Sequence, residues 1–197
     1  MLTRAQFRGL YKYHHLLDME TTGHSHQVAL LMRDLSREMG FSKEDCMVSY
    51  VLGYVHDCGK YYIPAAILQK NGPLSESEYD LIKAHPVLGA QIVFDATGSR
   101  ELAAVIAAHH ERLDGSGYPY GLGDRGILPL SRMLSICDSF EAMTAKRLYR
   151  SPLTAEAAAT ELQRCADIQF DKALVALFVE KVLPRWADKQ FSQPSRV

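Results

Sequence analysis

The stretch 42–60 places the strongest constraint on how this chain can fold. Ser42-Lys43-Glu44-Asp45 resembles a helix N-cap with an acid at the third position, and apolar residues recur at helical spacing from there to Val55. The helix then runs into His56-Asp57-Cys58-Gly59-Lys60, where the glycine breaks it. A histidine and a carboxylate at the end of a buried helix offer a metal a nitrogen and an oxygen donor. Such a pair is more often a capped helix end than a pair of metal ligands, so a metal site needs support from other parts of the chain.

Helix signals cover almost the whole chain, and no segment has the alternation of a strand. The fold class predicted is therefore all-α. Together with the histidines and acids of the chain, this leads us to expect a single compact helical domain with a multinuclear metal site in the helix core. Pro86 is expected to end one helix and to leave His85 at its terminus. The expected helices are 2–17, 20–40, 42–57, a short one near 64–68, 75–85, 87–95, 99–110, 129–143, 155–166 and 172–186.

Composition excludes several classes of protein. The chain carries 22 basic and 23 acidic side chains, for a formal net charge of −1, which argues against a general nucleic-acid or membrane-surface binder. No apolar run approaches the roughly 18 residues of a membrane-spanning helix, so a cytoplasmic location is expected. The 4 cysteines form no Cys-x-x-Cys pair, which indicates buried apolar side chains rather than a thiolate site.

Histidines and acids recur at spacings that suit metal binding. Glu20 and His24 lie one helical turn apart if the helix continues through Gly23. The alternative is that Glu20 is a favourable first-turn acid and that His24 packs in the core. Adjacent residues of a helix point about 100° apart, so His109 and His110 are expected to serve two neighbouring ions rather than one.

A glycine-rich loop follows the two histidines, from Arg112 to Gly123, and contains interleaved tyrosines and charges. It is either a plain surface loop or part of a nucleotide site, because a tyrosine in such a loop can stack on a base. Further along, residues 144–151 form a local basic cluster in an otherwise neutral chain.

The candidate ligands combine imidazole and carboxylate donors without thiolates. This set suits iron, manganese, zinc, cobalt or nickel. Two or three divalent ions would leave the site with net positive charge, which would attract an anion and favour phosphoryl chemistry. The candidates are Glu20, His24, His56, Asp57, His85, His109, His110 and Asp138.

The order of these motifs resembles the HD-GYP family, bacterial phosphodiesterases of cyclic di-GMP within the HD phosphohydrolase superfamily. The resemblance is carried by His-Asp-x-Gly-Lys at 56–60, His-Pro at 85–86, His-His-Glu-Arg-x-Asp-Gly-x-Gly-Tyr-Pro at 109–119, Asp-x-Phe-x-Ala-x-Thr at 138–144 and Arg-x-Tyr-Arg at 147–150. It covers about residues 20–180. It implies an all-α fold, a centre of two or three metal ions, iron first and manganese next, and hydrolysis of cyclic di-GMP to pGpG or GMP by a metal-bridging hydroxide.

The resemblance also implies roles for single residues. The seven matched histidines and aspartates look like metal ligands with Asp57 bridging, and Glu20 falls where trinuclear members carry an extra glutamate. Lys60 looks like the residue that holds the scissile phosphate, and Tyr118 resembles the loop tyrosine near the guanine. Arg147 and Arg150 match positions that contact the ligand's phosphates. Glu141 stands where the family has an aspartate, and it is expected near the substrate or the outer metal.

The sequence leaves three functional alternatives open. The first is cyclic di-GMP hydrolysis. The second is the same chemistry on another substrate, such as cyclic GMP-AMP or a mononucleotide. The third is a non-catalytic module that binds the nucleotide, or a diguanylate cyclase partner, through the loop 115–121. The domain organisation expected is an N-terminal helix (1–19), a catalytic domain (20–186) and a loose C-terminal tail (187–197).

Overall fold

The computed structural model describes residues 4–14, 19–145 and 151–191, and these residues form an all-helical fold. Within them, the only β-type pairings are the isolated bridges between Asp114 and Gly123 and between Ala166 and Phe170. The helices are α1 (Arg4–His14), α2 (Met19–Glu38), α3 (Lys43–Val55), η1 (Cys58–Tyr62), α4 (Ala65–Leu68), α5 (Glu76–Lys83), α6 (His85–Thr97), α7 (Arg100–Ala107), η2 (Asp124–Gly126), α8 (Pro129–Thr144), α9 (Ala155–Arg164), α10 (Lys172–Leu177), η3 (Phe178–Val182) and α11 (Leu183–Phe191).

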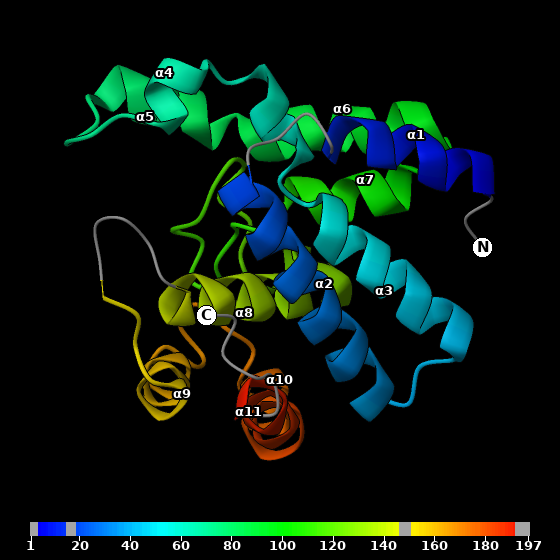
Figure 1. Cartoon of the computed structure of the whole chain (residues 1–197), viewed down its shortest axis with the longest axis vertical. Helices are drawn as coiled ribbons and strands as arrows, with labels where there is room; N and C mark the ends of the chain where they lie inside the picture. Colours follow the sequence, from blue (N-terminus) through cyan, green and yellow to red (C-terminus); the bar gives the residue numbers. More distant parts are fainter. Residues whose placement is uncertain (1–3, 15–18, 146–150, 192–197) are drawn as a thin grey trace.

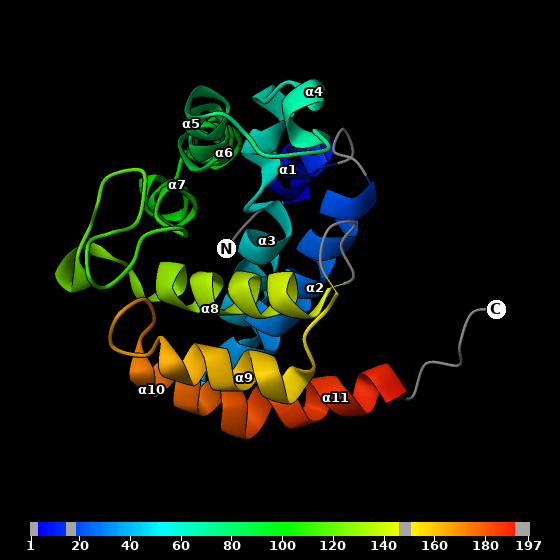
Figure 2. The same cartoon turned by 90° about the vertical axis from the view of Figure 1, so that its left-hand side faces the viewer.

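Three helices form the centre of the bundle. α2 packs against both α3 and α8, and the pair α6–α7 lies on one side of this group together with α1 (Figure 1). The short helices α4 and α5 lie at the outer end of that side. On the opposite side of α8, α9 runs beside the continuous helical segment from α10 through η3 to α11 (Figure 2).

One apolar core joins these layers. Its fully buried members include Met32 from α2, Leu52 from α3, Ile106 from α7 and Phe140 from α8. The Phe140 ring packs edge-on against Phe178, at a centroid distance of 5.0 Å, and so ties the C-terminal helices to α8. The candidate metal ligands lie at the ends and on the inner faces of the helices that pack around this core. Packing of these helices fixes the backbone positions of the ligands.

The helix starts predicted from capping residues are confirmed. The Ser42 side chain accepts from Asp45 N–H at the start of α3. At the start of α5, Ser75 and Glu78 form both hydrogen bonds of a capping box. Ser99 caps α7 in the same way. These starts could be predicted because a cap depends on three or four consecutive residues alone.

Two boundaries near the candidate ligands were predicted wrongly. His85 does not end α5 but begins α6, with Pro86 in its first turn, a position where proline has no N–H bond to lose. α7 ends at Ala107, so His109 and His110 lie in the turn beyond it and are not related by helical geometry. In addition, α11 continues to Phe191, past the point at 187 where a loose tail was expected.

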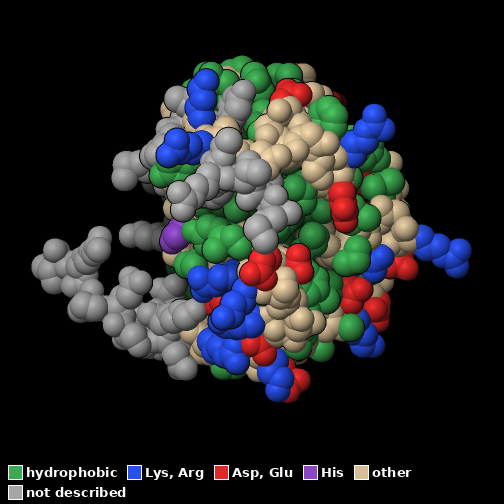
Figure 3. Space-filling model, turned by 90° about the vertical axis from the view of Figure 1, so that its right-hand side faces the viewer, with side chains coloured by type: hydrophobic (Ala, Val, Ile, Leu, Met, Phe, Trp, Pro, Cys, Tyr) green, Lys and Arg blue, Asp and Glu red, His purple; other side chains and the backbone are tan. Residues whose placement is uncertain are grey.

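The face seen in Figure 3 carries basic side chains next to acidic ones. Ion pairs of this kind join Asp34 to Arg33 and Arg37, and Glu38 to Arg185. This agrees with the small formal net charge of −1. None of the helices in the described part of the chain has the length and apolar content needed to cross a membrane.

Candidate metal centre

Five separate elements contribute side chains to one buried site. His24 lies on α2, His56 and Asp57 follow α3, and His85 begins α6. The turn after α7 and the inner face of α8 supply the rest, which are His109, His110 and Asp138. The donors fall into three overlapping groups whose ligand atoms lie within 4.8 Å of one another: His85 with His109 and His110, His24 with His56 and Asp138, and His56 with Asp57 and His109.

Three of the imidazoles are held in the same way. The Nδ1–H of His56 donates to Gly53 O at 2.8 Å, that of His85 to Ile82 O at 2.8 Å, and that of His109 to Ile106 O at 2.6 Å. Because a carbonyl can only accept, each Nδ1 carries a proton, so the neutral form of each ring has its lone pair on Nε2. The backbone thus selects the tautomer that directs Nε2 into the site.

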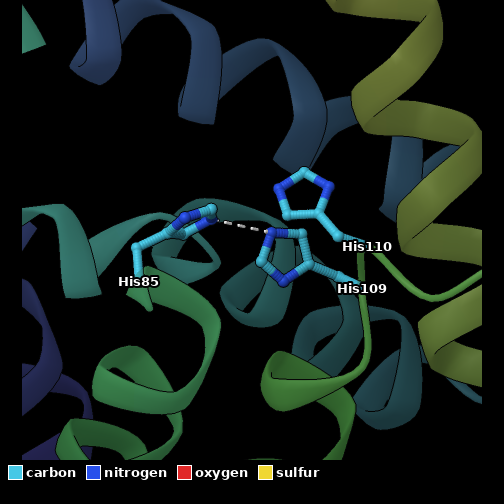
Figure 4. A group of neighbouring side chains, drawn as sticks. All are labelled: His85, His109 and His110. Carbon is cyan, nitrogen blue, oxygen red and sulfur yellow. Dashed lines mark hydrogen bonds between the residues drawn. The ribbon is translucent and has the colours of Figure 1, made fainter. Parts of the chain in front are cut away.

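These Nε2 atoms have no proton donor to satisfy them. His85 Nε2 and His109 Nε2 face each other at 3.3 Å (Figure 4). The His56 Nε2 is buried without a hydrogen-bond partner. Burial lowers the pKa of His85 to about 4, and burial together with the neighbouring rings lowers the pKa of His109 well below 6.5, so protonation is disfavoured. Cations held in the donor groups that contain these rings would satisfy the lone pairs, and the residues present therefore fit a metal.

Asp57 lies between the groups. Its Oδ1 is 3.3 Å from His85 Nε2 and its Oδ2 is 3.5 Å from His56 Nε2, while Oδ2 also accepts from Lys60 Nζ at 2.6 Å. Burial opposes ionisation, but the Lys60 ammonium and the surrounding imidazoles outweigh it and hold the pKa of Asp57 well below its usual range. Asp57 is thus an ionised carboxylate with an oxygen toward each of two imidazole groups, as a bridging ligand requires.

His24 is held between two carboxylates of α8. Its Nε2 lies 3.0 Å from Asp138 Oδ1, and its Nδ1 contacts Glu141 Oε2. Burial alone would lower its pKa, but the hydrogen bonds to Asp138 and Glu141 outweigh burial and raise the pKa to about 10. Glu141 itself is only 7% exposed. The structure therefore places Glu141 against the Nδ1 side of the His24 ring, whereas the sequence predicted it near the substrate or the outer metal.

The helical geometry from which His109 and His110 were expected to serve two different ions is absent, because α7 ends at Ala107. His109 and His110 lie in one donor group, with ring centroids 4.0 Å apart, because both follow the end of α7. His109 also belongs to the group with His56 and Asp57. Donors shared between groups would let one cluster hold more than one ion.

The glycine-rich loop folds back over the site. The Tyr118 ring lies 4.8 Å from the His110 ring, and Tyr118 N–H donates to His110 O at 3.2 Å. Gly117 allows this approach, because a Cβ there would lie 2.5 Å from Glu111 Cα. Tyr118 is thus fixed at the edge of the metal centre, while Tyr120 of the same loop is 60% exposed.

Glu111 is a site residue that the sequence reasoning missed. It is 2% exposed, and its two carboxylate oxygens accept from Tyr120 N–H at 2.7 Å and Leu122 N–H at 2.8 Å. It therefore holds the loop in place. The available signal was an acid directly after two candidate ligands and before a loop rich in backbone donors.

Three of the predicted site residues are not placed. Arg147 and Arg150 lie outside the described residues. Glu20 is in the first turn of α2, but its side chain lies outside the described part of the structure.

The comparisons with known proteins agree with this architecture. The fold and the site define a class of protein: an all-helical domain that encloses a buried cluster of histidines and aspartates. A sequence profile described as HD domain matches residues 13–174, and the chain belongs to this family. The resemblance inferred from the sequence motifs is confirmed.

Among curated relatives, a cyclic di-GMP phosphodiesterase of Thermotoga maritima is 35% identical over 165 residues, which is 83% of this chain and 45% of the relative. A 3'3'-cGAMP-specific phosphodiesterase 1 of Vibrio cholerae is 40% identical over 134 residues, 68% of this chain and 31% of the relative. The chain thus spans less than half the length of either. The solved HD domain of the L. monocytogenes phosphodiesterase PgpH, in complex with cyclic-di-AMP, superposes with a TM-score of 0.67 at 17% identity, over 95% of this chain and 99% of that one.

Proposed function

We propose that the chain is a metal-dependent phosphodiesterase that hydrolyses cyclic di-GMP to pGpG or GMP. The observation that carries this proposal is the convergence around the ionised Asp57 of three buried imidazoles whose Nδ1–H groups all donate to backbone carbonyls. Two or three ions, iron first and manganese next, would be held by His24, His56, Asp57, His85, His109, His110 and Asp138, with Glu20 as the further ligand for a third. Bound there, the ions would supply positive charge for the phosphate and an acidified water.

The protein's own residues would orient the substrate. The Lys60 ammonium lies beside Asp57 and is 25% exposed, so it can hold a phosphate oxygen and neutralise the leaving oxygen. The Tyr118 ring offers a face on which a base can stack. We assign phosphate contacts to Arg147 and Arg150 from the family resemblance. The relatives named as cyclic di-GMP phosphodiesterases support this substrate.

A second substrate is 3'3'-cyclic GMP-AMP, because the Vibrio cholerae relative specific for it is 40% identical to this chain. Hydrolysis of the two cyclic dinucleotides, compared side by side with iron- or manganese-loaded protein, separates the two proposals. Absence of pGpG and GMP at any metal loading would reject the first.

The substitution Asp57→Ala tests catalysis against a non-catalytic role. It removes the carboxylate between the imidazole groups and is expected to abolish turnover in vitro and to raise cyclic di-GMP in cells. If the cellular effect of the chain survived Asp57→Ala, the chain would act by binding, for example to a diguanylate cyclase through the loop 115–121.

A further inference from the structure

A pocket of about 530 Å³ lies next to the metal centre but outside it. This volume is within the range of small-molecule sites. Lys60 lines it on the side of the metal centre, and Lys70 is its other cation. The apolar part of its wall is formed by Ile67, Leu68, Leu74 and Ile82.

The apolar side chains of this wall are not part of the hydrophobic core. Neither α4 nor α5 buries any of its residues, and the four apolar side chains of the wall are only half-buried. They also lie outside the cluster that forms the core. Partly exposed apolar side chains that line a pocket are typical of a ligand site. Those on α4 and α5 would be covered by a flat, apolar ligand.

Two wall residues connect the pocket directly to the metal centre. Lys60 Nζ lies 2.6 Å from Asp57 Oδ2. The Ile82 carbonyl accepts the Nδ1–H of His85 at 2.8 Å. A phosphate held at Lys60 would therefore place its attached nucleoside at the mouth of this pocket.

We propose that this pocket binds a purine base of the nucleotide substrate, guanine by preference. The inference rests on the proposed function and adds a base subsite that is separate from Tyr118. The aliphatic side chains would cover the faces of the base. The Lys70 ammonium carries three N–H donors and contacts Glu78 Oε1 and Oε2 at 2.8 and 2.6 Å, so it presents a donor at the rim beside a carboxylate. Lysine commonly donates to O6 and N7 of guanine.

Filling the pocket tests the inference. Ile67→Trp and Leu74→Trp add a large ring from two parts of the wall, and neither residue belongs to the core, so both variants should fold. Ala66→Trp is the matched control, because Ala66 is exposed on the same helix and does not line the pocket. Two measurements are made: calorimetric binding of GMP, and the ratio of kcat/KM for cyclic di-GMP to that for methyl 4-nitrophenyl phosphate, which has no nucleobase.

The filled variants are expected to lose roughly ten- to hundredfold in GMP affinity and in this ratio, the value of one base contact. Ala66→Trp should match the wild type. If wild-type protein cleaves cyclic di-GMP and the filled variants keep both values, the pocket is not a base subsite. If the wild type binds no GMP, the inference also fails. If the wild type does not cleave cyclic dinucleotides but the filled variants lose GMP binding, the subsite stands and the proposed function fails.

Discussion

At the scale of single residues, the position of Glu141 gives a role that its type alone does not. Its carboxylate contacts His24 Nδ1, which leaves Nε2 of the same ring directed at the site. A carboxylate behind a metal-ligating histidine fixes the ring and raises its basicity. Glu141 is therefore expected to act as a positioning residue for His24.

We predict that Glu141→Ala weakens metal binding by roughly 10- to 100-fold, the usual cost of losing such a partner. Metal content after dialysis, measured by mass spectrometry, reports this directly. Glu141→Gln keeps an oxygen acceptor and should recover part of the affinity. Glu101→Ala, which removes an exposed acid of α7, is the matched control. Unchanged metal content in Glu141→Ala would contradict the positioning role.

A second prediction concerns the pH dependence of the metal-free chain. Burial lowers the pKa of His85 to about 4, whereas the unfolded chain binds this proton near 6.5. The unfolded state then binds more protons between these values, so stability is lost as the pH falls from 6.5 toward 4, by about 3 kcal/mol for this ring. The raised pKa of His24, about 10, acts with the opposite sign and removes stability as the pH rises above 6.5.

Urea unfolding in the presence of a chelator, from pH 5 to 9, should therefore show maximal stability near 6.5. His85→Gln should reduce the slope on the acid side, to which His109 contributes with the same sign, and His24→Gln should reduce the slope on the alkaline side. The exposed His26, changed to Gln, is the control for removal of a surface imidazole. A curve unaffected by either site variant would show that the two rings do not carry the linkage.

At the scale of elements, the sequence predicted where helices start better than it predicted where one helix ends and the next begins. Ser75 and Ser99 mark helix starts because their caps are local. Pro86 is ambiguous, since a proline follows the end of one helix as readily as it occupies the first turn of the next. The end of α7 carries no glycine or proline, so nothing local placed His109 beyond the helix.

The candidate ligands could be collected from the sequence by residue type, but their assignment to one shared site depended on the family resemblance. Spacing within one helix relates His24 to Glu20, but nothing in the local pattern relates His24 to Asp138, which lies on a different helix. The role of Glu111 could not be predicted either, because its burial depends on the loop that folds back on it and not on its local sequence.

The packing of η1 on α6 gives a prediction at this scale. A Cβ on Gly59 would lie 2.0 Å from His85 O and 2.5 Å from Gly89 N, both backbone atoms that cannot move independently. Gly59→Ala should therefore destabilise the fold by at least about 1–3 kcal/mol and displace His85 relative to Asp57. Gly23→Ala is the contrasting variant, since no atom lies within 4 Å of its Cβ position in α2, and it should stabilise by roughly 0.5–1 kcal/mol. Equal unfolding free energies for the two variants would contradict this account.

At the scale of the whole molecule, the candidate ligands come from one half of the bundle. They lie on α2, at the end of α3, at the start of α6, after α7 and on α8, whereas α9, α10 and α11 contribute none among the described residues. A bound ion would cross-link segments that are distant in sequence. The C-terminal helices would gain only through the shared core around Phe140.

Metal loading should therefore stabilise the chain unevenly. At a free Mn²⁺ concentration of about 100 times its dissociation constant, global stability should rise by about 2.7 kcal/mol. Hydrogen exchange should slow most where local opening would release a ligand, at the end of α3 and the start of α6, and least in α9. Asp57→Ala should abolish the local slowing. Equal slowing in α9 and around His56 would mean that the metal stabilises the bundle only globally, and slowing confined to α9 would place the ion elsewhere.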